Sequence, residues 1–186
     1  MPRIGIIVGS VADSSINLQV AKVLPTLVQD RDVEFEFLDF TDLPIYDYEM
    51  DADYPAEGKA WKAAIEAVDG VIIVTPEYSR SIPGGLKNAL DWASRPWGQN
   101  SFAGKPVAIM GASISAAGTA MAQQHLRAIL AHFDAPTMGQ PETFFLYDAS
   151  AFGADGTLQD EAQLGILRNF TEAAVDHVEK HLRIAA

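Results

Sequence analysis

Residues 71–76 read Val-Ile-Ile-Val-Thr-Pro, and this stretch decides the fold. It is short, rich in β-branched side chains and apolar at successive positions, which is the pattern of a strand buried on both faces. Such strands occur in parallel sheets that helices cover on each side, and proline stops them because it cannot donate to the ladder. The stretch therefore predicts a central strand of a parallel α/β sheet.

The same kind of pattern extends outward along the chain in both directions. Four further strand patterns occupy residues 4–8, 35–38, 107–110 and, more weakly, 142–146. Helical patterns occupy residues 20–28, 56–68, 86–94, 120–133 and 161–182, and Pro25 predicts that the first of these helices kinks or ends early. Strands and helices that alternate in this way predict a three-layer, doubly wound parallel sheet of five strands.

Length, charge and cysteine content restrict the protein class. The 186 residues, 48% of them hydrophobic, predict one domain over residues 1–186. A formal net charge of -12 opposes a nucleic acid partner, and the lack of cysteine means that any redox chemistry needs a cofactor. The first apolar run, residues 4–8, is too short for a membrane span or a signal peptide, so we expect a cytoplasmic protein with no membrane partner.

Three loops follow predicted strands and lie where open α/β sheets bind ligands, at the carboxyl ends of the strands. They cover residues 10–17, 76–85 and 111–119. The first offers hydroxyls, a side-chain amide and free backbone N–H groups at a helix N-terminus, which are the parts of a phosphate site. It matches neither GxGxxG nor the P-loop pattern. Alternatively, Ser14 or Ser15 only caps the helix and Asn17 faces solvent.

The second loop, residues 75–92, reads TPEYSRSIPGGLKNALDW. Its two prolines and two adjacent glycines favour a fixed loop whose backbone can approach a flat ligand closely, and Tyr78 offers a ring to pack against it. The alternative is a set of ordinary turn residues that precede an amphipathic helix.

The second loop resembles the signature of the NADPH-dependent FMN reductase family, which includes chromate and quinone reductases. The family pattern PEYN-x-S-x-PG-x-LKNA-[IL]-DW-x-SR matches residues 76–95 with few departures. Its first-loop pattern GS-x-R-x-x-S-x-N and its third loop are also matched, by Gly9, Ser10, Ser15 and Asn17 and then by Gly111, Ala112, Ser113, Gly118, Ala122, Gln123, Leu126 and Arg127. Nearly the whole chain is covered in the right order, so the resemblance implies a flavodoxin-like fold.

The resemblance also implies which residues bind FMN. The phosphate would be held, through side chains and backbone, by Ser10, Ser15, Ile16 and Asn17. The isoalloxazine ring would be bordered, largely through main-chain groups, by Pro76, Glu77, Tyr78 and Ser79, and on its other side by Gly111 and Ser113. Because the flavin carries the chemistry, no catalytic acid or base has to be named, and we expect no metal.

Two departures from the family pattern concern cofactor binding. Ala12 stands where the family commonly has Arg, with Asp13 beside it, and Ser79 replaces the usual Asn. One lost charge-assisted contact is worth roughly 1.5–3 kcal/mol unless another cation compensates. Arg80 is a candidate for that cation, and it is also a candidate to bind the nicotinamide phosphate or an anionic substrate.

The function implied is that of an NAD(P)H oxidoreductase with FMN as cofactor. NADPH or NADH would give hydride to flavin N5 in a ping-pong cycle, and a quinone, azo compound, free flavin or metal oxyanion would take the electrons. Neutral quinones are favoured because the negative net charge opposes anions at long range. The alternatives are a flavodoxin-type electron carrier without nicotinamide turnover, and a flavin-free interaction protein.

Other motifs carry less weight. Residues 111–115 nearly spell the GxSxG nucleophile elbow but lack the final glycine. His177 and His181 have the i, i+4 spacing of a metal pair without an HExxH pattern, and a solvated helix face is the favoured interpretation.

An acidic, aromatic stretch over residues 41–55 predicts a long loop. This loop either lines the mouth of the site, or its charged residues only keep it in contact with solvent. Trp92 and Trp97 suit the interface of a homodimer or homotetramer. Alternatively, Trp92 packs in the core and Trp97 lies on the surface.

Overall fold

A five-stranded parallel sheet forms the centre of the protein, in a computed structural model that describes residues 1–185. The strands, in the order β2-β1-β3-β4-β5, are β1 (Arg3–Val8), β2 (Glu34–Phe37), β3 (Gly70–Val74), β4 (Val107–Ser113) and β5 (Thr143–Leu146). The apolar stretch at residues 71–74 lies in β3, which is central and buried at every position. The predicted doubly wound α/β sheet is confirmed.

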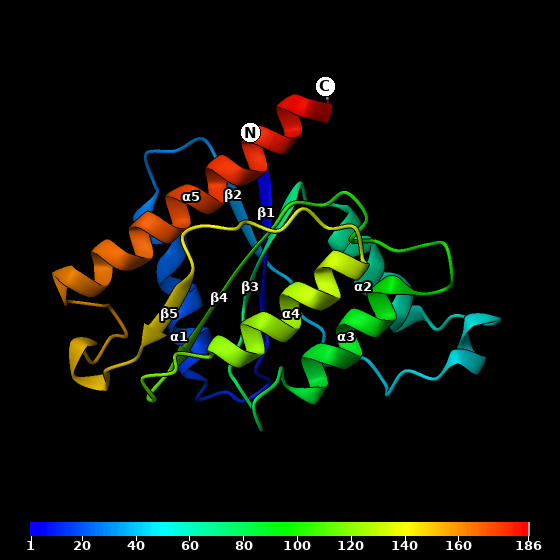
Figure 1. Cartoon of the computed structure of the whole chain (residues 1–186), viewed down its shortest axis with the longest axis horizontal. Helices are drawn as coiled ribbons and strands as arrows, with labels where there is room; N and C mark the ends of the chain where they lie inside the picture. The colour runs from blue at the N-terminus through cyan, green and yellow to red at the C-terminus, as the bar shows by residue number, and fades with distance from the viewer. Residues whose placement is uncertain (186) are drawn as a thin grey trace.

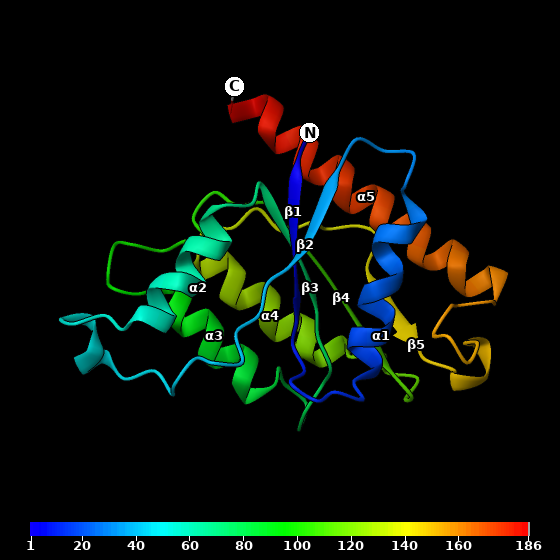
Figure 2. The same ribbon diagram turned by 180° about the vertical axis from the view of Figure 1, so that it is seen from behind.

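Helices cover both faces of the sheet, which makes three layers (Figure 1). Figure 2 shows α1 (Ile16–Val23) and α5 (Glu161–Ala185) on the opposite side from α2 (Ala56–Glu66), α3 (Gly84–Ser94) and α4 (Ala120–His132). Successive strand side chains point to opposite faces. Consequently Ile72 of β3 packs in the core beneath α1 and α5, whereas Ile73 packs in the core beneath α2, α3 and α4.

Several element boundaries differ from the sequence prediction. Helix α1 ends at Val23 and a 3-10 turn, Leu24–Leu27, follows with Pro25 near its start, as the proline predicts. Strand β4 runs on to Ser113, so Gly111 belongs to the strand and not to the loop. The stretch over residues 41–55 contains a 3-10 turn, Tyr48–Asp51, and a further 3-10 turn lies at Ala149–Ala151. Among residues 1–185, no helix is long and apolar enough to cross a lipid bilayer.

Candidate functional site

The three loops meet at the carboxyl edge of the sheet, which is the lower edge in Figure 1. Two backbone hydrogen bonds fix the starting points of the first and second loops. Gly9 N–H donates to the Val74 carbonyl at 2.8 Å, and Thr75 N–H donates to the Met110 carbonyl at 2.9 Å. The strand ladder therefore continues into the first residues of the loops. It brings the predicted phosphate loop and the predicted ring loop to adjacent positions.

The first loop ends in a capped helix. Ser15 is the N-cap of α1, and its Oγ accepts a hydrogen bond from Leu18 N–H at 3.2 Å. The first N–H groups of a helix have no intrahelical acceptor, so those of Ile16 and Asn17 point outward toward the loop. Hydroxyls and free N–H groups at the positive end of a helix form a donor set that fits a phosphate. The residues present are thus compatible with the phosphate of FMN.

Asn17 has a structural role that the sequence did not reveal. Its side chain is buried, its Nδ2 donates to the Ala112 carbonyl at 3.0 Å, and its Oδ1 accepts from Ala112 N–H at 2.9 Å. This pair of bonds ties α1 to β4, so the alternative that Asn17 faces solvent is wrong. Because the side chain is buried and both of its polar atoms bond to Ala112, we expect the contribution of Asn17 to a phosphate to come from its backbone N–H.

The second loop contains a two-residue hairpin turn. Tyr78 and Ser81 exchange backbone hydrogen bonds of 2.9 and 3.0 Å, and Ser79 and Arg80 between them have φ of 50° and 66°. Two successive left-handed residues characterise a type I′ turn, which Asn and Gly adopt most easily. This geometry explains why an Asn suits the position of Ser79. The turn leaves Tyr78 54% exposed and places Arg80 at the exposed tip.

The side chain of Glu77 points toward α4. Its Oε2 accepts hydrogen bonds from Met121 N–H at 3.0 Å and Ala122 N–H at 3.1 Å. Thr119, the residue at the N-cap position, makes no side-chain cap, so Glu77 caps the helix from a different loop. Its carboxylate is therefore engaged with α4. Any contact of Glu77 with a flavin ring would come from the main chain, as the resemblance implies.

Gly111 lies between the start of the second loop and the end of the third. A Cβ at this position would lie 2.1 Å from the Thr75 carbonyl oxygen and 2.1 Å from Thr119 Oγ1. Gly111 is buried, whereas Ser113 at the end of β4 is half-buried, with its Oγ accepting from Ser115 N–H at 3.0 Å. The glycine thus permits the packing beneath the site. Direct contact of Gly111 and Ser113 with flavin stays a prediction.

Helix α3 anchors the acidic stretch beside the site. Asn88 Nδ2 and Trp92 Nε1 donate to the Pro44 carbonyl at 2.9 and 2.7 Å, and Arg95 forms an ion pair with Asp51. Sequence reasoning missed these contacts, although the i, i+4 spacing of Asn88 and Trp92 places both on one face of α3. Residues of the family signature hold this stretch in place. It is therefore part of the packed structure beside the site and not only a solvated loop.

Trp92 belongs to this anchoring network and lies in the core. Its indole is fully buried, so the prediction that it anchors a subunit interface is wrong, while Trp97 is 81% exposed and stays available for that role. The Tyr54 hydroxyl donates to the Trp92 carbonyl, and burial raises the pKa of Tyr54 well above its ordinary value. Burial and the hydrogen bond to Asp51 likewise raise the pKa of Tyr46. Both phenols are therefore neutral hydrogen-bond donors near neutral pH.

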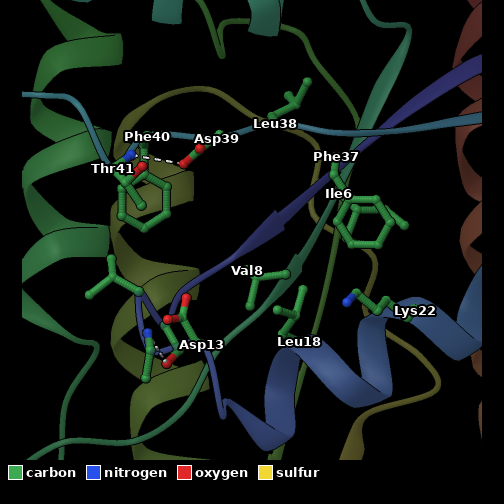
Figure 3. Close-up of a pocket in the computed structure, with 13 residues that line it drawn as sticks. Ile6, Val8, Asp13, Leu18, Lys22, Phe37, Leu38, Asp39, Phe40 and Thr41 are labelled. Atoms are coloured by element: carbon green, nitrogen blue, oxygen red, sulfur yellow. Dashed lines mark hydrogen bonds between the residues drawn. The ribbon is translucent and has the colours of Figure 1, made fainter. Parts of the chain in front are cut away.

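A cavity of about 460 Å³ lies between the first loop and the end of β2 (Figure 3). Its lining combines apolar side chains with a few polar ones and comprises Ile6, Val8, Ser10, Val11, Ala12, Asp13, Leu18, Lys22, Phe37, Leu38, Asp39, Phe40 and Thr41. It includes part of the predicted phosphate loop but none of the residues predicted to border the ring. The cavity lies on the β2 side of the phosphate loop, whereas the tip of the ring loop, residues 78–80, is exposed to solvent.

Known proteins resemble this chain over most of its length. A 2-hydroxy-1,4-benzoquinone reductase from Burkholderia sp is 46% identical over 170 residues, which cover 91% of this chain and 92% of that protein. A quinone reductase from Pseudomonas putida is 36% identical over 182 residues, covering 97% and 95%. The structure of FerB, a flavoenzyme NAD(P)H:(acceptor) oxidoreductase from Paracoccus denitrificans, superposes with a TM-score of 0.91 at 42% identity, covering 97% and 99%. The profile of the NADPH-dependent FMN reductases matches residues 2–148, and the chain therefore belongs to this family of flavin-dependent oxidoreductases.

Proposed function

We propose that this chain is an FMN-dependent NAD(P)H oxidoreductase whose preferred acceptors are quinones. The observation that carries the proposal is a phosphate-binding donor set at the start of α1 next to an exposed aromatic turn at Tyr78. Two of the similar proteins are named as reductases of quinones, which supports the acceptor class.

The first loop would bind the phosphate of FMN and the second loop would bind its ring. The hydroxyls of Ser10 and Ser15 and the N–H groups of Ile16 and Asn17 would hold the phosphate, and the main chain of residues 76–79 would border the ring. When bound, FMN supplies hydride acceptance and electron donation, which no side chain of this cysteine-free protein supplies. The type I′ turn and the cap from Glu77 to α4 hold the ring loop in one conformation.

The open surface beside Tyr78 supports a ping-pong sequence. NADPH or NADH would occupy the exposed face first, and the quinone would occupy it after the nicotinamide has left. In each case the reacting atom of the substrate would lie roughly 3–3.5 Å from the reacting atom of the flavin. Tyr78, Ser79 and Arg80 are exposed, so this face is open to small, flat acceptors. The negative net charge favours neutral quinones over anions, and Arg80 at the tip of the turn is the residue we expect to meet the anionic part of a substrate.

Assembly and location stay predictions. We expect a homodimer or homotetramer, with the exposed Trp97 as a candidate interface residue, and a cytoplasmic enzyme.

Initial-rate kinetics test the proposal. With purified flavin-loaded protein, NADPH is varied at several fixed concentrations of 1,4-benzoquinone, and a ping-pong enzyme gives parallel double-reciprocal lines. Bound FMN without turnover would favour the electron-carrier alternative. Protein that is colourless and takes up no FMN would favour the flavin-free alternative, and either result would refute the proposal.

A further inference from the structure

The first loop lacks a cation at position 12, where the family pattern has arginine. Ala12 replaces the family arginine, and Asp13 adds a negative charge next to the predicted phosphate position. Both residues line the cavity between the first loop and the end of β2. A small side chain at position 12 leaves room there, so a cation from another element can approach the loop.

Lys22 is a cationic side chain on the wall of this cavity. It lies on α1 at the i+7 position from the N-cap Ser15 and at i+4 from Leu18, and these spacings place the three residues on one helix face. Helical side chains lean toward the N-terminus of their helix, which here is the phosphate end. Figure 3 shows the Lys22 ammonium directed into the cavity, toward Leu18 and Val8.

The ammonium of Lys22 has no competing partner. Within residues 1–185 it takes part in none of the ion pairs, which engage Arg3, Arg31, Lys87, Arg95, Arg127 and Arg183. Asp39, a second carboxylate on the cavity wall, accepts a hydrogen bond from Thr41 N–H at 2.9 Å and is thus turned to its own loop. The Lys22 side chain is exposed to solvent, so its attraction to a phosphate should be screened by added salt.

Arg80, the other candidate, is less suitable. It occupies the exposed tip of the type I′ turn with φ of 66°, and it does not line the cavity that contains Ala12. We propose that Lys22 supplies the positive charge for the FMN phosphate that position 12 does not provide. This inference rests on the proposed function, because it requires that FMN binds with its phosphate at the first loop.

Equilibrium dialysis of the full-length protein against FMN, and separately against riboflavin, tests the inference. Riboflavin lacks the phosphate, so a charge that acts on the phosphate affects FMN alone. We expect Lys22→Ala to weaken FMN binding by about three- to tenfold, an effect that shrinks with added salt, and to leave riboflavin binding unchanged. Lys22→Arg should retain wild-type affinity for FMN, and adding Ala12→Arg to Lys22→Ala should restore it.

Two further variants serve as controls. Lys59→Ala removes an exposed lysine of α2, away from the cavity, and should leave the affinity for FMN unchanged. Arg80→Ala tests the competing cation. The inference is refuted if Lys22→Ala binds FMN as the wild type does, if it loses riboflavin affinity equally, or if Arg80→Ala alone shows the phosphate-specific loss. Wild-type protein that binds neither flavin would refute the proposed function itself, a result that differs from all of these.

Discussion

Gly111 is the residue of the site where the structure leaves least room. We predict that Gly111→Ala lowers the free energy of unfolding by at least about 2 kcal/mol, because its Cβ would lie 2.1 Å from the Thr75 carbonyl oxygen and from Thr119 Oγ1. Urea denaturation measures the change. Gly139→Ala is the matched control, since a Cβ at Gly139 meets no atom within 4 Å. Equal stability of the two variants would show that the loops can separate at little cost.

Single residues also mark the limit of prediction from the sequence. The resemblance identifies Asn17 as part of the site, but its partner is the backbone of Ala112, 95 positions away. No local pattern encodes such a pair, because the partner offers only main-chain atoms that every residue has. The same holds for Glu77, whose carboxylate meets the backbone of α4. Motifs thus reveal which residues matter before the fold reveals what they contact.

The link between the ring loop and α4 leads to a prediction at the scale of elements. Glu77→Ala removes the acceptor for Met121 N–H and Ala122 N–H, and we expect it to destabilise the protein by about 1–2 kcal/mol. Glu77→Gln keeps an acceptor oxygen and should cost less than half as much. Thermal unfolding followed by circular dichroism measures both changes.

The control for Glu77 is Glu172→Ala, which removes an exposed carboxylate of α5. If Glu77→Ala were no more destabilising than Glu172→Ala, the capping role would be wrong. Loss of FMN in Glu77→Ala together with retention in Glu77→Gln would indicate that the cap also holds the ring loop in position.

Strands and helices were predictable because their signals are local. The β-branched run of β3 and the helical spacing of α3 each identify an element without reference to the rest of the chain. The end of β4 was not predictable, since residues 111–113 are small or polar and become a strand only by pairing with β5 through Gly111 and Phe144 and their neighbours. Similarly, the acidic stretch has no period of its own, and contacts from α3 hold it in place.

At the scale of the whole molecule, His177 joins α5 to the segment between α4 and β5. Its Nε2 donates to the Pro136 carbonyl at 2.9 Å, and its ring centroid lies 4.4 Å from that of His181. The prediction of a solvated face is wrong for His177, which is half-buried. Residues 1–185 contain no group of three or more candidate metal ligands near it or elsewhere.

This burial predicts a dependence of stability on pH. Burial, with the positive charges of His181 and Lys180, lowers the pKa of His177 below its ordinary value of 6.5, although the hydrogen bond to Pro136 opposes the shift. The unfolded chain therefore binds the proton more readily than the folded one. The contribution of neutral His177 to the free energy of unfolding is fully present above about pH 6.5. It should be lost as the pH drops through 6.5 toward the lowered pKa.

Melting temperatures between about pH 5 and 8 test this dependence. His177→Gln can still donate to the Pro136 carbonyl and does not titrate, so its melting temperature should fall less steeply with acid than that of the wild type. His132→Gln, at an exposed position of α4, should follow the wild type. Identical slopes for the wild type and His177→Gln would contradict the assignment.

The central claim is that one flavin site accepts electrons from a nicotinamide and gives them to a quinone in separate steps. The most direct measurement is an anaerobic titration of the purified flavin-loaded protein. NADPH without an acceptor should bleach the visible flavin band stoichiometrically, and 1,4-benzoquinone added after removal of the nicotinamide should restore it. A band that NADPH and NADH leave unchanged, or that quinone restores only while nicotinamide is present, would contradict the account.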